Sequence, residues 1–297
     1  MYLISSTKLN NARAALQRTE PYFFALQAMF ARVLRHLPED FHHPYLDTRA
    51  EHVNPRRAII CVTADKGLAG AYNHNVIKTA MDQLRPDTND MLFTVGEVGR
   101  QYFLRHGVNV DESFHYTAQK PTLSRARQIT SRMLELFADE EIDEVFLVFT
   151  AMKNSMESEV RMIQLLPLIH LDQNAFAQRS VAAAQENFHM EPSPAQLLDN
   201  IVPDFVNGYV YSALVESYAA EHSARMQAMD AANKNGRELV QELQIHYNRE
   251  RQAQITQEIT EIAAGARARR QQLERAKKRR EKAAHESGGS NPDRNPA

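Results

Sequence analysis

The 297-residue sequence has no tryptophan, one cysteine and no apolar run close to 18 residues. A single Cys61 excludes an internal disulfide and a metal site built from several thiolates. It lies in the apolar run 58–62, which indicates a buried, unreactive thiol. The missing long apolar run excludes a membrane-spanning helix, and no secretory signal is recognisable. We therefore expect a protein of a reducing cytoplasm, with two compact units or one unit and an extended arm.

The near-neutral charge of −2 conceals an asymmetry. Residues 266–297 contain ten Lys and Arg against four Asp and Glu, which gives this tail +6 and leaves −8 for the preceding residues. The average charge therefore says little about partners, and the difference between body and tail needs its own explanation.

The first segment, residues 1–37, is predicted to be a coiled-coil helix. Its apolar residues recur in alternating steps of three and four, at positions 9, 12, 16, 23, 26, 30, 33 and 37, with only Thr19 breaking the series. Such a stripe requires a partner helix. Pro21 removes a backbone donor and is expected to bend the helix near residues 18–20, without necessarily ending it.

Residues 57–195 are predicted to form an α/β domain. Strands are expected at 58–63, 91–95, 145–150 and 162–168, and helices at 75–84, 98–106 and 124–137. Buried strands that alternate with helices indicate a mainly parallel sheet. Residues 187–194 are expected to form an edge strand or a linker.

The third segment is predicted to be one long helix, because no proline occurs between Pro203 and Pro292 and strong helix formers dominate. The coiled-coil part is predicted at residues 204–268, with continuation of the helix to 284 as an alternative. Small residues at 213, 219, 220, 224, 228, 231 and 232 would let a second helix approach closely.

Together these segments predict an antiparallel coiled coil of the terminal helices with an inserted, mainly parallel α/β domain. The two helices must run antiparallel because the chain leaves and returns through the same domain. The second helix is much longer than the first, so its apolar stripe beyond the paired part predicts another protein around it.

The sequence offers little catalytic chemistry. Residues 63–73 stand where a phosphate loop would be, but the lysine precedes the first glycine and the Gly-x-Gly-x-x-Gly spacing is absent. A structural turn with Asn73 capping the next helix is favoured over nucleotide binding. The histidines are scattered and no nucleophile elbow occurs. We expect no catalytic residue, no metal and no cofactor.

Residues 267–282 contain nine basic residues in sixteen. They could form an arm that binds nucleic acid or an anionic membrane surface. A solvated helix end, followed by a disordered tail, is the favoured alternative because no aromatic residue is present to stack on bases. The segment 269–297 is therefore described as a basic extension, and nucleic acid is not expected as a partner.

Four stretches resemble, in order, the gamma subunit of F-type ATP synthases. The most specific is Ile-Thr-Gln-Glu-Ile-Thr-Glu-Ile-Ala-Ala-Gly-Ala at 255–266, which is similar to the C-terminal signature of that family. The others are residues 8–13, 65–73, and 213–217 together with 221–226. The resemblance covers nearly everything up to residue 268.

The resemblance implies a non-catalytic rotor of a proton-translocating ATP synthase. In that family the helix pair enters a head of alternating alpha and beta subunits, while the α/β domain rests, with the epsilon subunit, on a membrane ring. The rotor couples ion flow to ATP synthesis or hydrolysis by biasing three catalytic sites in turn. The implied location is the cytoplasmic face of a bacterial membrane, as a peripheral subunit.

The resemblance also assigns residues. Those that match contacts with the catalytic head are Arg251, Gln252, Ile255, Thr256, Glu258, Ile259 and Ile262. The loop matching the side that faces epsilon and the membrane ring contains Asp65, Lys66, Gly67 and Asn73.

Two departures from the family pattern concern the ends. Family members usually begin earlier, so Met1 is expected to be an internal methionine of a longer product, with a natural short-armed variant as the alternative. They also normally end near residue 268, so the basic extension has no counterpart in the pattern.

Overall fold

The computed structural model describes residues 2–38, 40–46, 54–85, 90–154, 157–168, 190–191 and 193–287. It divides the chain into two units, Met1–Ala231 and Ala232–Ala297, each of which is described by itself. The tail expected to be disordered, and half of the expected edge strand or linker at 187–194, lie outside the described residues. The division of the sequence into residues 1–37, 57–195, 204–268 and 269–297 remains a prediction.

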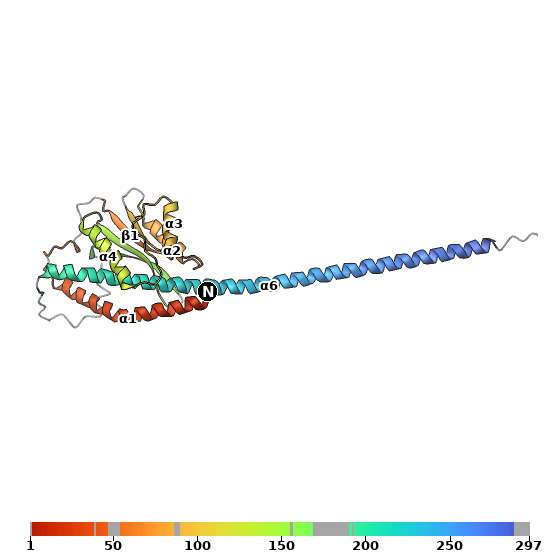
Figure 1. Cartoon of the computed structure of the whole chain (residues 1–297), viewed down its shortest axis with the longest axis horizontal. Helices are drawn as coiled ribbons and strands as arrows, with labels where there is room; N and C mark the ends of the chain where they lie inside the picture. The colour runs from red at the N-terminus through yellow and green to blue at the C-terminus, as the bar shows by residue number, and fades with distance from the viewer. Residues whose placement is uncertain are drawn as a thin grey trace, which may run out of the picture. The chain divides into compact units, whose positions relative to one another are not determined.

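A four-stranded sheet lies at the centre of the first unit (Figure 1). Its strands are β1 (Arg57–Val62), β2 (Met91–Val95), β3 (Glu144–Met152) and β4 (Ser158–Leu166), in the order β2-β1-β3-β4. β1 pairs in parallel with β2 and β3, whereas β4 is antiparallel to β3. The predicted mainly parallel sheet is therefore confirmed.

Side chains on the strands alternate between two helical layers. Ile59 and Cys61 face a cluster that includes residues of α2 (Tyr72–Gln83) and α3 (Glu97–Arg105). Ile60 and Val62 belong to a second cluster, shared with α4 (Leu123–Ala138) and the two terminal helices. Cys61 is fully buried and its burial raises the pKa of the thiol, as expected for an unreactive core residue.

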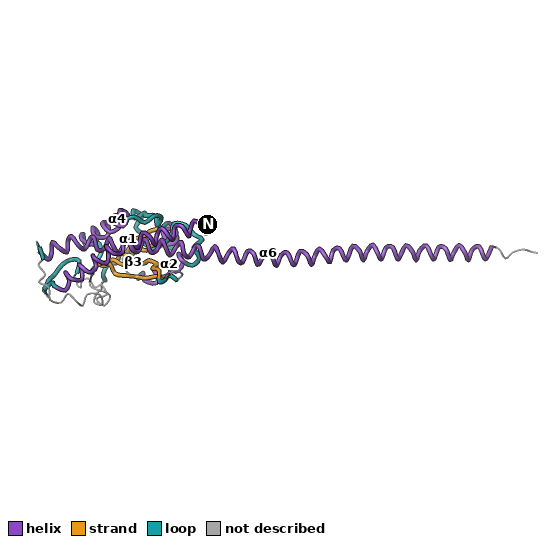
Figure 2. Tube along the Cα trace, turned by 90° about the horizontal axis from the view of Figure 1, so that it is seen from below, coloured by secondary structure: helices purple, strands orange, loops and turns teal. Residues whose placement is uncertain are grey.

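The terminal helices are α1 (Tyr2–Arg35) and α6 (Pro194–Ser287). Within the first unit the two helices lie side by side and their chains run in opposite directions (Figures 1 and 2). Phe30 stacks on Phe205 with ring centroids 4.6 Å apart, and Phe23 lies 6.0 Å from Tyr211. The predicted antiparallel pair is confirmed for this unit.

Both terminal helices contain a proline and continue through it. α1 is continuous across Pro21, as expected. α6 begins at Pro194 and includes Pro203, so it starts earlier than the expected residue 204. Buried neighbours of Pro203 explain this, because the apolar contacts of Val202, Phe205 and Val206 offset the missing backbone hydrogen bond.

Close packing of the pair depends on small residues of α6. The side chains of Ala213, Ala219 and Ala220 are buried, as the small-residue stripe predicted. Gly208 lies directly against the Phe23 ring, where a Cβ would come within 2.6 Å of Phe23 Cδ1. Ala213 and Ala219 belong to the core shared with α1, whereas Ala220 packs with Ala64, Ala69 and Tyr72 of the α/β domain. Ala231 and Ala232 are exposed, so the stripe serves contact between the two helices only in part.

Candidate partner-binding surfaces

The part of α6 in the second unit exposes all its side chains through residue 282. Several of these side chains are large and apolar, and Ile255, Ile259 and Ile262 are between 47% and 73% exposed. The other large apolar side chains here are Leu239, Val240, Leu243, Ile245, Tyr247 and Leu273. A row of exposed apolar side chains of this extent marks an interaction surface.

The seven residues assigned to the catalytic head lie on one side of this helix. At about 100° per residue they fall within an arc of about 160°, with the isoleucines in the middle. Arg251 and Glu258 form one flank, and Gln252 and Thr256 the other. The Thr256 hydroxyl donates a hydrogen bond to the carbonyl of Gln252, 2.8 Å away. We call this set the distal face; its role in binding stays a prediction.

The opposite side of the same segment is small or polar. It contains Ala253, Gln257, Thr260, Glu261 and Ala264. Its polar groups bond within the helix: the Gln257 amide donates to Glu261 at 3.0 Å, and the Thr260 hydroxyl donates to the Thr256 carbonyl at 2.7 Å. Over residues 251–264 the large apolar side chains therefore lie on one side of the helix only.

The loop 65–73 follows β1 and is held by its own first residue. The half-buried Asp65 carboxylate accepts hydrogen bonds from the backbone amides of Glu97, Ala118 and Gln119, at 3.2–3.3 Å, and from the Thr117 hydroxyl. A carboxylate with this many donors orders the loops it joins. Asp65 thus faces the domain, and its assigned contact with a partner stays a prediction.

Asn73 does not cap the following helix, so that expectation was wrong. α2 begins at Tyr72 with Ala71 as its N-cap residue, and no side chain caps it. The Asn73 side-chain oxygen instead accepts a hydrogen bond from the backbone amide of Ala64 at 2.9 Å. This bond satisfies a donor just beyond the end of β1.

Three residues at the tip of the loop are exposed: Lys66, Gly67 and Leu68. Leu68 has 71% of its surface exposed and a φ of 63°, a backbone conformation that is uncommon outside glycine. Lys66 and Gly67 are the contacts that the resemblance implies, and the structure adds Leu68 to them as an exposed neighbour. The exposure of Leu68 and its positive φ can be seen only in the structure.

Sequence reasoning also missed the residue that fixes this tip to the helix pair. Arg225 on α6 donates from Nη2 to the carbonyl oxygens of Lys66 and Gly67, at 3.2 Å each. The same nitrogen lies 2.6 Å from Glu221, and Nη1 lies 3.1 Å from Nδ1 of His222. The loop is therefore a structural turn held against α6.

The charges of this clamp are largely removed from water. Burial raises the pKa of Glu221, and Arg225 opposes that change. Burial and the Arg225 charge lower the pKa of His222 to about 4, so the imidazole is neutral near pH 7. The loop tip is thus joined to α6 by a buried charged network.

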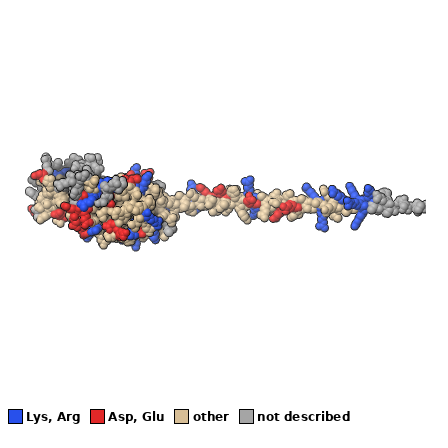
Figure 3. Space-filling model, turned by 90° about the horizontal axis from the view of Figure 1, so that it is seen from above, with Lys and Arg blue, Asp and Glu red and all other residues tan. Residues whose placement is uncertain are grey.

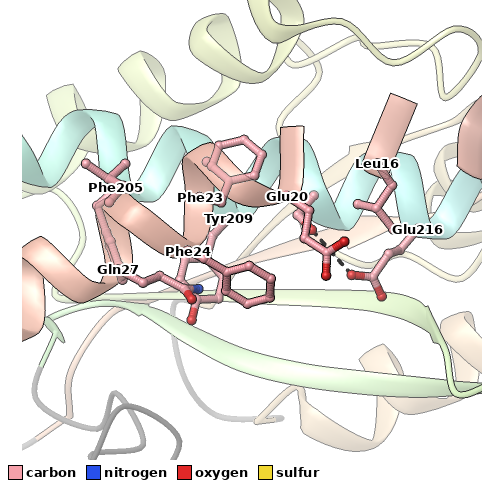
Figure 4. A pocket seen from close by; sticks show the side chains of 11 residues that line it. Leu16, Glu20, Phe23, Phe24, Gln27, Phe205, Tyr209 and Glu216 are labelled. Atoms are coloured by element: carbon pink, nitrogen blue, oxygen red, sulfur yellow. Dashed lines mark hydrogen bonds between the residues drawn. The ribbon is translucent and has the colours of Figure 1, made fainter. Parts of the chain in front are cut away.

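A cavity of about 250 Å³ lies between α1 and α6 (Figure 4). Phe23, Phe24, Phe205 and Tyr209 line its apolar part, and Glu20 and Glu216 lie near one another at its other end. The Ser212 hydroxyl is 3.3 Å from the Glu216 carboxylate, and burial raises the pKa of Glu216. The cavity is a gap in helix packing with an acidic edge.

Within the described parts of the chain, no group of three or more His, Cys, Asp and Glu side chains is placed to hold a metal ion. Among the same residues, no helix combines the length and the apolar character needed to span a bilayer.

Comparison with known proteins identifies the family. A family model described as "ATP synthase" matches residues 1–268. The ATP synthase gamma chain of Caldanaerobacter subterraneus is 40% identical over 274 residues, which cover 90% of this chain and 92% of the relative. That of Ruminiclostridium cellulolyticum is 38% identical over 269 residues, which cover 90% and 91%. This chain belongs to the ATP synthase gamma-chain family.

As a member of the gamma-chain family, the protein is the central-stalk rotor of an F-type ATP synthase and has no catalytic activity of its own. It is part of the peripheral portion of that complex.

Solved structures agree on the fold of the gamma-chain family. A chain in the central stalk and c-ring structure of Tetrahymena thermophila mitochondrial ATP synthase superposes with a TM-score of 0.57 at 18% identity, covering 78% of this chain and 97% of that one. A chain of the Euglena gracilis enzyme gives 0.52 at 14% identity, covering 100% and 98%.

Proposed function

We propose that the distal face of this gamma-family rotor contacts the catalytic head of alpha and beta subunits and transmits rotation to it. The observation that carries the proposal is the exposed row of Ile255, Ile259 and Ile262 on one half of a continuous helix. Burying these side chains against a partner is favourable, at roughly 25 cal/mol for each Å² removed from water.

The difference between the two sides of the helix supplies the coupling. A shaft that is apolar on one side and polar on the other makes different contacts with each of the subunits around it. Each subunit would then be biased toward a different conformation as the helix turns, which is a population shift driven by differential contacts. A helix with the same surface all round could not bias them differently.

The α/β domain also has a role in this proposal, as the part of the rotor that receives force from the membrane side. We place the loop tip of Lys66, Gly67 and Leu68 on the side that faces the epsilon subunit and the membrane ring, because it is exposed and yet clamped to α6 by Arg225. Force applied to the tip would pass directly to the helix pair. The complex would work at the cytoplasmic face of a bacterial membrane, with each proton supplying about 2.3 kcal/mol per 100 mV.

The test is assembly and coupling in the complete complex. The full chain is co-expressed with the other subunits of its ATP synthase and purified through a tag on the beta subunit. The triple variant Ile255→Gln, Ile259→Gln, Ile262→Gln is compared with a control on the opposite side, Ala253→Gln with Ala264→Gln. Glutamine preserves helix propensity, so both variants should keep the helix.

We expect the wild-type chain to co-purify with alpha and beta. The isoleucine variant should lose about 2 kcal/mol or more of binding, equivalent to a roughly 30-fold weaker association, and should lose ATP-driven proton pumping. The control should retain both. A wild-type chain that remains monomeric beside alpha and beta overturns the proposal, and equal losses in both variants would remove the role of the distal face.

A further inference from the structure

The helix continues beyond the family match as a basic arm, which we define as residues 269–282. The family model ends at residue 268, whereas α6 continues to Ser287. All side chains of the arm are exposed, and eight of the fourteen are Lys or Arg. Neither the family match nor the distal face accounts for this concentration of positive charge.

The positive charge of the arm points in every direction around the helix. At about 100° per residue, one third of the circumference carries Arg275, Arg279 and Lys282, and the next carries Arg269 and Arg280. The remaining third carries Arg270, Lys277 and Lys278 together with Glu274 and Glu281. Figure 3 shows blue side chains projecting on opposite sides of this part of α6. Each third therefore keeps a net positive charge.

This distribution disfavours binding to a flat anionic membrane. A helix lying on a bilayer needs one apolar side to insert and concentrates its cations on the other. Leu273 is the only large apolar residue of the arm, and much of the positive charge would face away from the lipid.

Nucleic acid is also disfavoured as the partner. The arm contains no aromatic residue to stack on unpaired bases. Glu274 and Glu281 lower the net charge on one side of the arm, and a protein surface, unlike a phosphate backbone, can place hydrogen-bond donors beside them among its carboxylates.

We infer that the basic arm docks within an acidic protein surface that surrounds the helix. The inference rests on the proposed function, because the arm follows the distal face along the same helix: Arg275 lies about 20 Å beyond Ile262 at 1.5 Å per residue. The partner is therefore the alpha and beta subunits, through carboxylates that face the helix from several sides.

Contacts of this kind suit a turning shaft. Charge attraction needs no fixed side-chain geometry and acts over about 8–10 Å at physiological salt. The arm can therefore keep favourable interactions at every angle, and it would also speed the insertion of the helix into the head.

The test uses three variants that each remove two charges from a different side of the arm. They are Arg275→Gln with Arg279→Gln, Arg269→Gln with Arg280→Gln, and Arg270→Gln with Lys277→Gln. The matched control, Glu274→Gln with Glu281→Gln, makes the arm more positive. Each full-length chain is mixed with the tagged alpha and beta complex, and association and dissociation rates are measured from low to high salt.

If the partner surrounds the arm, all three variants should associate several-fold more slowly at low salt, by similar factors. Combining the six substitutions should slow association about tenfold or more, and the difference should vanish at high salt. The glutamate control should associate at least as fast as wild type. An effect confined to one pair would overturn the surrounding geometry, and no effect in any pair would overturn docking of the arm.

The same variants are tested on vesicles containing phosphatidylglycerol and on a short DNA duplex. If the variants bind the vesicles or the DNA more weakly than wild type but bind alpha and beta equally well, the inference is overturned in favour of the membrane or of nucleic acid. Wild-type chain that does not bind alpha and beta at all overturns the proposed function itself. Wild-type binding that is insensitive to the arm overturns only the present inference.

Discussion

Arg225 forms an ion pair with Glu221 at 2.6 Å, one turn apart on α6, and uses the same nitrogen to hold two carbonyl oxygens of the loop tip. Only 10% of the Arg225 side chain and 6% of the Glu221 side chain are exposed. The pair is therefore a joint between the α/β domain and the helix pair.

Replacing Arg225 with Gln should destabilise the protein by about 3 kcal/mol, because it leaves a buried carboxylate without its partner. Urea unfolding measures the loss, and hydrogen exchange should show faster exchange of the amides of residues 66–70. The stability of Arg225→Lys should lie between those of wild type and Arg225→Gln, because an ammonium keeps the charge but lacks the planar set of donors. The double variant Glu221→Gln, Arg225→Gln should be less destabilised than Arg225→Gln. Near wild-type stability in Arg225→Gln would contradict the claim that Arg225 and Glu221 hold the α/β domain to the helix pair.

A second prediction concerns the contact of Gly208 with Phe23. A methyl group on residue 208 would lie 2.6 Å from Phe23 Cδ1. Gly208→Ala should therefore force the helices apart and cost about 1–3 kcal/mol, measured by thermal or urea unfolding.

The same helix supplies the control. Gly236 has no atom within 4 Å of an added Cβ, so Gly236→Ala should stabilise α6 by up to about 1 kcal/mol through helix propensity alone. Adding Phe23→Leu to Gly208→Ala should recover part of the loss. If both alanine variants were stabilising, the close packing at Gly208 would be refuted.

The sequence predicted those elements whose residues carry their own signal. β1 and β2 are short runs of apolar residues buried on both faces, and the stripe of α1 predicted that another helix packs against it. β4 was expected only from Met162, because Ser158, Glu159 and Arg161 lie on the more exposed half of this strand, where no apolar run marks it.

Other features depend on contacts between distant parts of the chain. Pro203 is a helix breaker by local rules, but the buried residues beside it keep α6 continuous. Arg225 pairs locally with Glu221, yet the carbonyl groups it holds are 158 and 159 residues away. Leu68 is of a residue type that is usually buried, yet it is exposed. No spacing rule predicts these outcomes, because each is decided by tertiary packing.

Asp90 should make stability sensitive to acid. Its side chain is buried and contacts the partly exposed Arg57 and Arg85, whose Nη2 atoms lie 2.9 Å and 2.8 Å from its carboxylate oxygens. Burial acts to raise its pKa, but hydrogen bonds from Arg85 and Arg57 outweigh burial and hold the pKa well below its usual range. Because the folded pKa is depressed, this stabilisation is present above the ordinary aspartate pKa of about 3.9 and is lost as the pH falls below it.

Urea unfolding between pH 5 and pH 2.5 measures this effect. Asp90→Asn should be destabilised near neutral pH and should show a smaller further loss in acid than wild type. Asp82→Asn, at an exposed position of α2, serves as the control and should follow the wild-type curve. An unchanged acid dependence in Asp90→Asn would exclude the aspartate as its source.

His222 should act in a different pH range. Its pKa is lowered to about 4, first by burial and then by the charges of Arg225 and Lys8. The unfolded chain takes up this proton near pH 6.5, whereas the folded chain takes it up only near pH 4. The contribution of His222 to stability is therefore complete above pH 6.5 and decreases between pH 6.5 and 4, by roughly 3 kcal/mol in all.

The measurement is the free energy of unfolding at pH 7.5 and pH 4.5, compared between wild type and His222→Gln. Glu216 and Glu221 have raised pKa values and contribute in the opposite sense, since the folded state holds their protons more tightly. Their effect is common to both proteins, so the difference between the two curves isolates the histidine. His222→Gln should lose less stability than wild type on acidification. Parallel curves would mean that His222 takes up its proton as readily in the folded chain as in the unfolded one.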